Sequence, residues 1–294
     1  MRKKQTQMVL TAENQKLLEN FIVGGLEEDL NERGDLTSLA CIDADDRSEA
    51  YLLVKDPGVL AGVEVAEAII KHVDPTAKIK ILKSDGDAVS YGDIAFELEC
   101  NTHALLKAER LILNTMQRMS GIATLSNRFK FEVEDLNVSI LDTRKTTPLI
   151  RFLEKWSVKL GGCENYRFGL FDWFMIKDNH VDACGSIKSA IQKVHDYQKA
   201  NSLDLNITVE VRNLIELYDA LEVGGFKRLL LDNFEIPLLR EAVAIVDQRY
   251  ETEASGGINI HNVREVAKTG VDYISIGAIT HSATSLDLSL KVKK

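Results

Sequence analysis

Hydrophobic and polar residues follow two different patterns along the chain, and the change comes between residues 120 and 138. In the first part, strand-like segments at 49–54 and 77–82 lie between turn sequences rich in aspartate, glycine and proline. A polar helical stretch near residues 11–24 precedes them. This order of elements predicts an α+β unit.

The first part closes with a helical pattern. Apolar residues recur at helical spacing from Leu105 to Met119, and Asn101 or Thr102 is placed to cap the start of the helix. Gly121 is placed to end it, because glycine readily adopts the left-handed conformation that terminates many helices. A second face of the same helix carries polar side chains: Arg110, Asn114 and Gln117.

After residue 138, short β-branched runs alternate with amphipathic segments. The strand-like runs are VSIL (138–141), WFMI (173–176), ITVEV (207–211), RLLL (228–231), YETEA (250–254) and YISIG (273–277). The helix-like segments are 149–160, 186–200, 213–223, 235–248 and 261–269. Repeated βα units predict a parallel sheet, either doubly wound or closed as a barrel. Since every run ends in polar or glycine residues, and barrel enzymes build their sites from many strand ends, we favour the barrel.

The composition is that of a globular protein with an acidic balance. Of 294 residues 45% are hydrophobic, and 45 Asp and Glu outweigh 36 Lys and Arg, which gives a net charge of −9. A sequence-independent nucleic-acid binder needs a basic face that displaces counterions, so we expect no nucleic-acid partner. No apolar run approaches the roughly 20 residues that span a bilayer, so we expect no membrane partner.

Cysteine usage and the N-terminus both favour a reducing, cytoplasmic setting. The chain has neither a C-x-x-C motif nor histidines at metal-ligand spacing, so a disulfide framework and a zinc site are not indicated. The first 18 residues are basic but lack the apolar core and the small-residue cleavage site of a secretory signal. We therefore expect a cytoplasmic protein.

The stretch LDTRKTTP, at 141–148, places two cations directly after a strand-like run in this acidic chain. Four cations come from two strand ends and the loop between them: Arg144, Lys145, Arg167 and Lys177. Cations at a barrel mouth need an anion that neutralises them. That anion is either a bound ligand or a salt-bridge network with acidic neighbours: Asp142, Asp172 and Asp178. Three other cations recur at helical spacing and predict a solvent-exposed helix face: Arg151, Lys155 and Lys159.

Two acids are expected on neighbouring strands. In ITVEV, Thr208 and Glu210 share the face opposite to the aliphatic residues, and Asp232 follows RLLL at the end of the next run. Each acid alone is explained by a solvated position on the rim. Together they suit binding of sugar hydroxyls, a divalent metal, or positive charge on a reacting carbon.

Glycines mark the ends of the last two runs. Ser255, Gly256 and Gly257 follow one run and precede a helix that Asn259 or Asn262 can cap, and Gly277 ends the other run. Glycine lets the backbone approach a phosphate closely, and a helix N-terminus offers free N–H groups. The pair predicts a phosphate site at the usual barrel position, although each glycine alone is compatible with a tight turn. His180 and His281 lie near the same rim, where we expect hydrogen-bonding partners.

These residues belong to blocks of sequence that resemble the quinolinate phosphoribosyltransferase family, the decarboxylating nicotinate-nucleotide pyrophosphorylases. The blocks occur in order over nearly the whole chain: EDLNERGDLTS (28–38), GVLAGVEVAEAI (58–69), AERLILNTMQRMSGIAT (108–124), LDTRKTTP (141–148), KLGGCENYRFGLFDWFMIKDNHV (159–181), LLLDN (229–233), EASGGI (253–258) and GVDYISIGAITHS (270–282). Eight ordered blocks are far more specific than a single glycine motif.

The resemblance implies an N-terminal α/β sandwich, residues 1–120 with the tail 283–294, and an open seven-stranded α/β barrel over residues 121–282. It also implies a homodimer, or a larger homo-oligomer, in which the sandwich of one subunit covers the barrel mouth of the other. The resemblance places Arg110 across that interface. It assigns quinolinate to Thr143, Arg144, Lys145, Tyr166, Arg167 and Lys177. It assigns phosphoribosyl pyrophosphate, with Mg²⁺, to Glu210, Asp232, Ser255, Gly256, Gly257, Ser275, Gly277 and His281.

The implied reaction needs no nucleophile from the protein. Glu210, Asp232 and Lys145 are the expected catalytic residues, and Glu210 and Asp232 are expected to contact Mg²⁺ indirectly, through the pyrophosphate substrate. Many family members have histidine where this chain has Tyr166, which cannot carry an imidazolium charge. Three alternatives remain: a related enzyme with another anionic acceptor, an aldolase that uses Lys145 or Lys177, and a non-catalytic ligand sensor.

Overall fold

The computed structural model describes residues 12–293, so most of the basic N-terminal segment lies outside the described residues. The chain divides into two compact units. The first contains the described residues up to Asn127, Thr146–Gly162 and the residues from Ile279 onward, and the second contains Arg128–Lys145 and Cys163–Ala278. No helix within residues 12–293 is both long and apolar enough to cross a bilayer.

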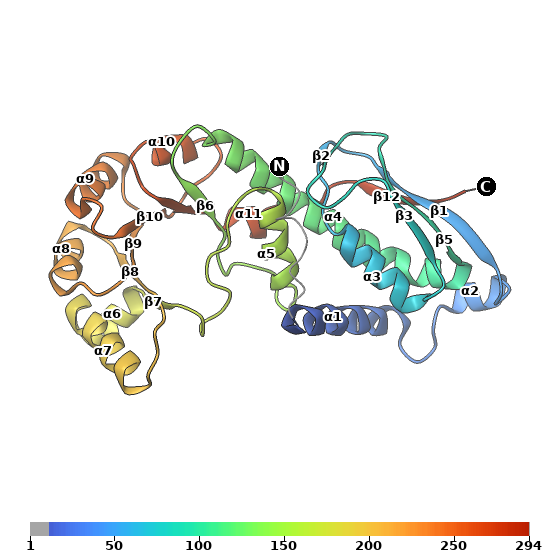
Figure 1. Cartoon of the computed structure of the whole chain (residues 1–294), viewed down its shortest axis with the longest axis horizontal. Coiled ribbons are helices and arrows are strands. Elements are labelled where there is room, and N and C mark those ends of the chain that lie inside the picture. Colours follow the sequence, from blue (N-terminus) through green and yellow to red (C-terminus); the bar gives the residue numbers. More distant parts are fainter. Residues whose placement is uncertain (1–11, 294) are drawn as a thin grey trace. The chain divides into compact units, whose positions relative to one another are not determined.

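The first unit contains a four-stranded antiparallel sheet in the order β12-β1-β5-β3 and a small β2-β4 pair (Figure 1). Its strands are β1 (Arg47–Val54), β2 (Gly58–Val59), β3 (Lys78–Ile81), β4 (Ala88–Val89), β5 (Ile94–Asn101) and β12 (Leu288–Val292). Its helices are α1 (Ala12–Leu30), α2 (Leu36–Cys41), α3 (Val63–Val73) and α5 (Arg151–Leu160), with most of α4 (Thr102–Glu132) and of α11 (Ala278–His281). Alternate residues of β1 are fully buried, as expected for a sheet with a packed face.

The long helix α4 begins where the sequence predicts and continues beyond the predicted end. The Asn101 side chain accepts a hydrogen bond from the Ala104 backbone N–H at 3.1 Å, which caps the helix. The prediction that Gly121 ends the helix is wrong, because α4 continues to Glu132. A Cβ at Gly121 would clash with the backbone carbonyl of Thr284, so this glycine allows close packing. The predicted domain boundary after residue 120 therefore falls inside α4.

Helix α5 is amphipathic in a different sense from the one predicted. Lys159 is exposed, but Lys155 is 3% exposed, so the prediction of a solvent-exposed face at 151, 155 and 159 is wrong at its centre. The neighbouring Glu154 is fully buried and accepts hydrogen bonds from Arg118 of α4 and from the backbone N–H and hydroxyl of Thr147. The buried charge of Glu154 is therefore compensated by hydrogen bonds from other parts of the chain.

The second unit is built around a six-stranded parallel sheet in the order β6-β11-β10-β9-β8-β7. Its strands are β6 (Ser139–Leu141), β7 (Phe174–Ile176), β8 (Ile207–Val211), β9 (Arg228–Asp232), β10 (Glu251–Ser255) and β11 (Tyr273–Ser275). Its helices are α6 (Asp178–Cys184), α7 (Ile187–Ala200), α8 (Leu214–Val223), α9 (Ile236–Val246) and α10 (Val263–Ala267). All six strands and four of the five helices of this unit match predicted segments, and α6 was not predicted.

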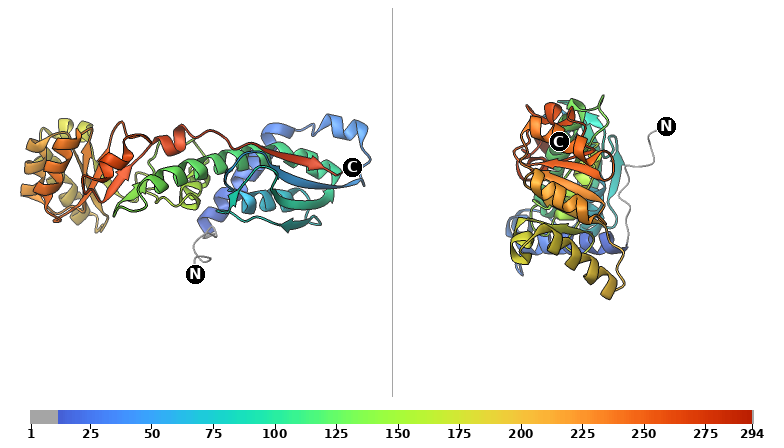
Figure 2. Two further views of the ribbon diagram at one scale, coloured as in Figure 1. Left: turned by 90° about the horizontal axis from the view of Figure 1, so that it is seen from above. Right: turned by 90° about the vertical axis from the view of Figure 1, so that its left-hand side faces the viewer.

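The sheet is curved, and the helices of this unit lie on its outer side (Figures 1 and 2). An isolated parallel bridge joins Leu141 of β6 to Glu164, beyond the edge of the six strands. Glu164 thus occupies the place of a seventh strand, reduced to one residue, next to β6. The α/β fold is confirmed, with six strands and this bridge where seven strands were expected.

Candidate active site

The predicted site residues of the second unit gather at one end of the parallel sheet. Each strand ends in, or is followed within four residues by, a member of the predicted set: Thr143–Lys145 after β6, Lys177 after β7, Glu210 in β8, Asp232 in β9, Ser255 in β10 and Gly277 after β11. Because all six strands are parallel, these positions lie along the same edge of the sheet. The positions that the sequence analysis placed at strand ends therefore do lie at strand ends.

Glu210 and Lys177 form an ion pair at this edge. The Lys177 ammonium lies 3.0 Å from Glu210 Oε2, and the Glu210 side chain is 8% exposed whereas that of Lys177 is 45% exposed. Lys177 is the N-cap of α6, and its backbone N–H donates to His180 Nδ1 at 3.0 Å. His180 therefore acts as the hydrogen-bonding partner that the sequence indicated, and it fixes the backbone of Lys177.

Asp232 faces the same side of the sheet as Glu210. Glu210 pairs with Leu230, and Asp232 lies two residues further along β9, so both side chains leave the same face. The hydroxyl of Ser255 donates to Asp232 Oδ1 at 2.5 Å, and the Asn233 amide donates to Oδ2 at 2.6 Å. Both carboxylate oxygens are thus held in place by neighbouring side chains.

The glycine turn after β10 has the open backbone that a phosphate site requires. Gly256 and Gly257 are exposed and have φ values of 93° and 63°, which an L-residue adopts only with strain. The Asn262 side chain donates to the Gly257 carbonyl at 3.1 Å and accepts from the Asn259 N–H at 2.8 Å. These two asparagines therefore order the turn. Of the two predicted caps, Asn262 makes no side-chain cap on α10, whereas the Asn259 side chain accepts from the His261 N–H at 2.9 Å in the turn that leads into the helix.

The cations of the DTRK segment and Arg167 lie close enough to influence each other. Arg144 and Lys145 are exposed, and the Lys145 backbone N–H donates to the Thr143 hydroxyl at 3.0 Å. Burial lowers the pKa of Arg167, and the positive charge of Arg144 lowers it further. The Arg167 guanidinium donates to the Trp173 carbonyl at 3.1 Å and to Met175 Sδ at 3.4 Å, which fixes it beside β7. The positive charges of Arg144 and Arg167 therefore influence each other.

Two of the three acids that could neutralise these cations internally accept hydrogen bonds from the loop before β7, and Asp172 also attracts Arg167. Asp142 accepts from the Tyr166 N–H at 2.8 Å and from the Asn165 amide at 2.7 Å. Asp172 accepts from the backbone N–H groups of Phe168 and Gly169 at 2.6 and 3.0 Å. These carboxylates therefore shape the loop that carries Arg167.

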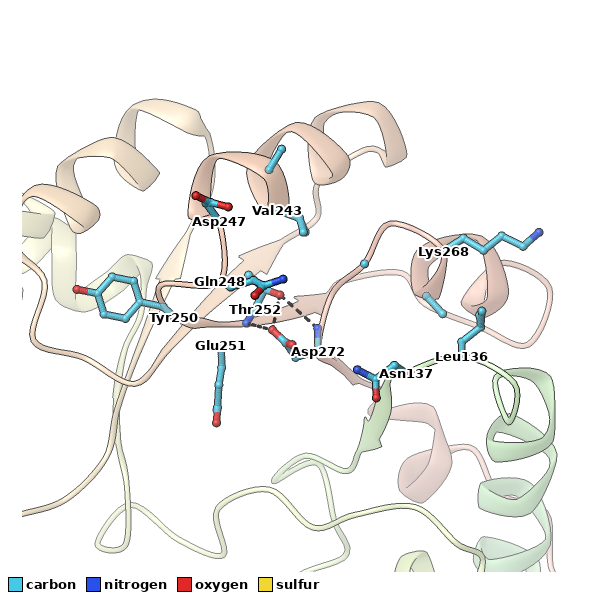
Figure 3. Close-up of a pocket in the computed structure, with 13 residues that line it drawn as sticks. Leu136, Asn137, Val243, Asp247, Gln248, Tyr250, Glu251, Thr252, Lys268 and Asp272 are labelled. Carbon is cyan, nitrogen blue, oxygen red and sulfur yellow. Dashed lines mark hydrogen bonds between the residues drawn. The ribbon is translucent and has the colours of Figure 1, made fainter.

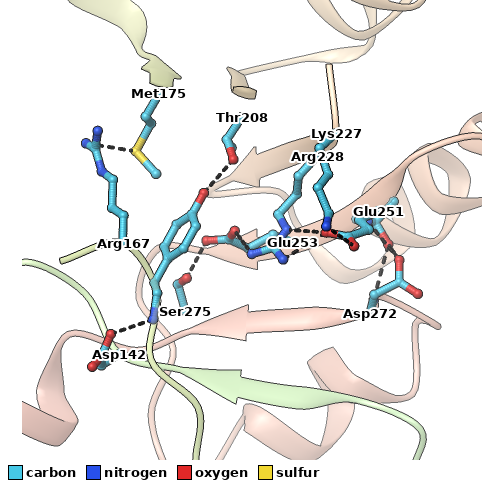
Figure 4. A network of polar contacts seen from close by, with 12 residues as sticks. Asp142, Arg167, Met175, Thr208, Lys227, Arg228, Glu251, Glu253, Asp272 and Ser275 are labelled. Carbon is cyan, nitrogen blue, oxygen red and sulfur yellow. Dashed lines mark hydrogen bonds and ion pairs between the residues drawn. The ribbon is translucent and has the colours of Figure 1, made fainter. Parts of the chain in front are cut away.

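Tyr166 lies in the loop between β6 and β7, and Ser275 is the last residue of β11. The Tyr166 hydroxyl is 2.6 Å from the Thr208 hydroxyl, inside the sheet, and burial raises the pKa of Tyr166 (Figure 4). The Ser275 hydroxyl donates to Glu253, which is fully buried. Both hydroxyls are therefore bonded to protein groups beneath the site.

A buried ionic network below the site was missed from the sequence. Arg228 donates to Glu251 at 2.8 and 3.0 Å and to Glu253 at 3.1 Å (Figure 4). Its guanidinium also stacks on the Tyr273 ring, 3.7 Å from the ring centroid. Burial raises the pKa of Glu253. The alternation of side chains along a strand could have revealed this network. Arg228 lies on the same face of β9 as Asp232, and Glu253 lies on the same face of β10 as Ser255.

A hollow of about 830 Å³ opens at the opposite ends of the strands (Figure 3). It is bordered by Glu251 at the start of β10 and by Asp272 just before β11. Asp272 accepts from the N–H and hydroxyl of Thr252 at 2.7 and 2.8 Å, so its carboxylate ties two strands together. The predicted site residues of this unit lie at the carboxyl ends of the strands, away from this hollow.

Arg110 and His281 belong to the first unit, unlike the rest of the predicted set. Arg110 is exposed on α4, one turn before the exposed Asn114. His281 is exposed at the end of α11, and its Nδ1 lies 2.7 Å from the Ser282 hydroxyl. Within residues 12–293 there is no cluster of three or more His, Cys, Asp and Glu side chains that suits a metal ion.

Comparison with known proteins decides the family. Residues 35–120 match the model of the quinolinate phosphoribosyl transferase N-terminal domain, and residues 122–291 match the model of its C-terminal domain. The chain belongs to the quinolinate phosphoribosyltransferase family. The sequence-based identification is thus confirmed over most of the chain.

Curated relatives and solved structures agree with this family over nearly full length. The chain is 42% identical to the chloroplastic nicotinate-nucleotide pyrophosphorylase (carboxylating) of Arabidopsis thaliana, over 91% of this chain and 80% of that protein. It is 39% identical to the probable nicotinate-nucleotide pyrophosphorylase (carboxylating) of Bacillus subtilis, over 94% and 92%. The crystal structure of nicotinate-nucleotide pyrophosphorylase from Ehrlichia chaffeensis is 36% identical, with a TM-score of 0.89 and coverage of 97% and 100%.

Proposed function

We propose that this chain transfers the phosphoribosyl group of phosphoribosyl pyrophosphate to quinolinate and releases CO₂ and pyrophosphate, which gives nicotinate mononucleotide for NAD biosynthesis. Family membership supports the activity, and the strand-end site supports its assignment to residues. The observation that carries the assignment is the ion pair at the strand ends between Lys177 and the buried Glu210, with 3.0 Å between Nζ and Oε2. The positive charge of Arg144 also lowers the pKa of Arg167, and a bound dicarboxylate would relieve that repulsion.

Quinolinate binding falls to the cationic part of the site. Arg144 and Arg167 offer planar, bidentate donors to the two carboxylates. Thr143 and Lys145 extend the same segment, and the Lys145 N–H already bonds to the Thr143 hydroxyl. Lys177 follows β7, the next strand along the chain. Its ion pair with Glu210 of β8 connects the cationic residues of the site to the acidic ones.

The ribose 5-phosphate part of phosphoribosyl pyrophosphate fits the residues at the ends of β8, β9 and β10. Glu210 and Asp232 supply carboxylate oxygens for ribose hydroxyls, and Ser255 with the Gly256–Gly257 turn supplies backbone room for the 5′-phosphate. Two carboxylates beside a diphosphate also fit Mg²⁺, which is usually bound by one or two carboxylates together with substrate phosphates. When bound, Mg²⁺ would neutralise charge on the departing pyrophosphate.

The chemistry then balances without a covalent enzyme intermediate. The lone pair of the pyridine nitrogen forms a bond to C1 of the ribose as the bond from C1 to the pyrophosphate oxygen breaks. Glu210 and Asp232 stabilise the positive charge that develops on the ribose. When the bond from C2 to the neighbouring carboxylate breaks and CO₂ leaves, the electron pair stays on C2, where the positive charge of the adjacent pyridinium nitrogen stabilises it. A proton from water completes the product.

We also propose that the working enzyme is a cytoplasmic homodimer, or a larger homo-oligomer, with shared sites. Arg110 is an exposed cation on α4 and is proposed to reach the quinolinate site of the partner protomer. His281 is proposed to contact the 5′-phosphate. Both assignments rest on the family motif.

Matched lysine variants test the site. Lys177→Met removes a cation that pairs with a buried carboxylate, and Lys188→Met removes an equally exposed lysine that pairs with Asp219 at 3.0 Å and Glu222 at 2.7 Å. For Lys177→Met we expect a loss of about 2 kcal/mol, or roughly 30-fold in kcat/KM for quinolinate. We expect no comparable loss for Lys188→Met. Equal activity of both variants would remove Lys177 from the site.

Mixed subunits test the shared site. Arg110→Ala and Glu210→Ala should each abolish activity, and mixing the two variants after mild dissociation should restore part of it. Restoration is expected because a mixed dimer contains one site with both residues intact. Two inactive variants that stay inactive after exchange of subunits would contradict the shared site.

A further inference from the structure

Asn233 lies beside the catalytic carboxylate in an uncommon backbone conformation. It follows Asp232 directly, has a φ of 56° and is exposed. Left-handed backbone conformations are uncommon for residues other than glycine, and asparagine tolerates them better than most side chains. The conformation turns the Asn233 side chain back toward Asp232 and toward the glycine turn.

Three contacts connect Asn233 to the two halves of the proposed ribose 5-phosphate site. Its amide Nδ2 donates to Asp232 Oδ2 at 2.6 Å, and its backbone N–H donates to the Ser255 carbonyl at 2.9 Å. The amide nitrogen must face Asp232, because two oxygens at this distance would repel each other. A Cβ at Gly256 would clash with Asn233 Oδ1, with its Cγ and with its backbone nitrogen. The asparagine therefore packs directly against the turn.

We propose that Asn233 is a positioning residue that holds Asp232 and the Ser255–Gly257 turn in one arrangement, so that one substrate molecule is gripped at its ribose and at its 5′-phosphate together. The proposal rests on the proposed function. Asn233 acts through Asp232 and through the turn.

The hydrogen-bonding capacity of Asp232 agrees with this role. Each carboxylate oxygen has two lone pairs, and Ser255 and Asn233 each occupy one, on different oxygens. One lone pair on each oxygen is left for the sugar or for Mg²⁺. With Asn233 removed, the carboxylate can rotate about its terminal torsion, which is broad for aspartate.

The close fit against Gly256 explains why glycine is needed there. Gly256 has a φ of 93°, and the space where a side chain would begin is filled by Asn233. At Gly257 a Cβ would meet nothing within 4 Å. The glycine at 256 therefore serves the contact with Asn233, in addition to the backbone conformation.

Two substitutions of Asn233 separate its donor from its backbone conformation. Asn233→Asp keeps the shape but places a carboxylate oxygen where Nδ2 meets Asp232, so the two groups repel. Asn233→Gly keeps the left-handed conformation without strain and removes the amide. Asn31 is the matched control, since it is exposed with a φ of 46° in the first unit and its Oδ1 accepts from the Glu32 N–H.

Steady-state kinetics with each substrate varied in turn give the decisive readout. For Asn233→Asp we expect KM for phosphoribosyl pyrophosphate to rise at least tenfold and KM for quinolinate to stay within twofold, with a smaller rise for Asn233→Gly. Asn31→Asp and Asn31→Gly should match wild type. Calorimetric binding of ribose 5-phosphate to the intact enzyme, without quinolinate, should weaken in the same order.

The outcomes distinguish this proposal from the function on which it rests. An active wild type whose Asn233 variants keep both KM values would overturn the positioning role. Equal changes in both KM values, or a loss of thermal stability with unchanged KM, would also overturn it, since they indicate a general structural role. An inactive, folded wild-type enzyme would instead contradict the proposed function.

Discussion

An Arg228→Met substitution removes the guanidinium that bridges two carboxylates inside the sheet of the second unit. In the wild-type protein Arg228 donates to Glu251 and Glu253 at 2.8 to 3.1 Å and stacks on Tyr273 at 3.7 Å. The Arg228 side chain is 5% exposed and that of Glu253 is fully buried. Methionine fills much of the aliphatic volume but leaves Glu253 without its cation, whereas Glu251 keeps its ion pair with Lys227 at 3.6 Å.

The expected cost follows from this burial. Removing one partner of a buried ion pair costs about 3–5 kcal/mol, because the remaining charge is left in a poorly solvated place. With an m-value of about 3 kcal/mol/M, this corresponds to a urea midpoint lower by about 1–1.7 M. A loss of this size is a large part of the roughly 5–15 kcal/mol that stabilises most proteins.

Urea unfolding followed by circular dichroism measures the effect, with Arg264→Met as the matched control. Arg264 also forms a bidentate pair, with Asp135 at 2.7 and 2.8 Å, but both side chains are about half exposed. Exposed pairs contribute little, so the midpoint of the control should change far less. Both variants lose one arginine, which keeps the change in net charge the same.

The pH dependence of the two variants should also differ. Burial raises the pKa of Glu253 above its ordinary value of 4.5, and loss of Arg228 raises it further. The folded variant then binds a proton that the unfolded chain releases, so its stability falls as the pH rises above about 4.5. The deficit of Arg228→Met should therefore be larger at pH 8 than at pH 5.

The control should show no such change between pH 5 and pH 8. Hydrogen bonds from Arg264 lower the pKa of Asp135 from 3.8 to about 2. The stability that this pair contributes is present above pH 3.8 and is lost only as the pH falls toward 2. Equal midpoint losses for the two variants, or a deficit of Arg228→Met that does not depend on pH, would refute the account of the buried network.

Three further substitutions have expected outcomes. Gly256→Ala should lower kcat/KM for phosphoribosyl pyrophosphate at least tenfold, and Gly257→Ala should lower it less, because only the first methyl group meets packed atoms; steady-state kinetics would contradict this if the order were reversed. Tyr166→Phe should lower the free energy of unfolding by about 1–3 kcal/mol, measured in urea, because it removes the tyrosine hydroxyl that lies 2.6 Å from the Thr208 hydroxyl. Glu154→Ala should cost about 3–5 kcal/mol, measured in the same way, because it leaves Arg118 without its carboxylate; a cost near zero would show that water replaces the pair.

The second unit was predictable because its hydrophobic pattern and its local structure agree. Short runs such as ITVEV became strands at the predicted places, and polar strand ends led directly to Glu210 and Asp232. Helix α6 was not predicted because it has seven residues and begins immediately after Lys177, so no separate hydrophobic period announces it.

Predictions from local sequence failed where tertiary packing decides. Glycine is common at the ends of helices, but Gly121 lies inside α4, where the chain near Thr284 packs closely against it. Lys155 follows the period of a charged face but is buried. Nothing within α5 alone distinguishes it from the exposed Lys159, since the partners of a buried charge come from other parts of the chain.

The site residues were predictable by type and position, but their contacts were not. The sequence predicted that Arg144 and Arg167 share a site, and in the structure the charge of Arg144 lowers the pKa of Arg167. It did not reveal that the Tyr166 hydroxyl bonds to Thr208 beneath the site. Such contacts depend on how each loop packs against the sheet, and the periodicity of hydrophobic residues does not determine this.

The most direct test of the central claim is the product balance of the wild-type enzyme with quinolinate labelled at the carboxylate next to the nitrogen. With phosphoribosyl pyrophosphate and Mg²⁺, the account predicts labelled CO₂ and pyrophosphate in equal amounts, together with unlabelled nicotinate mononucleotide. Nicotinate, which lacks the second carboxylate, should be a poor substrate. Folded enzyme that releases no labelled CO₂, or that prefers nicotinate, would contradict the account.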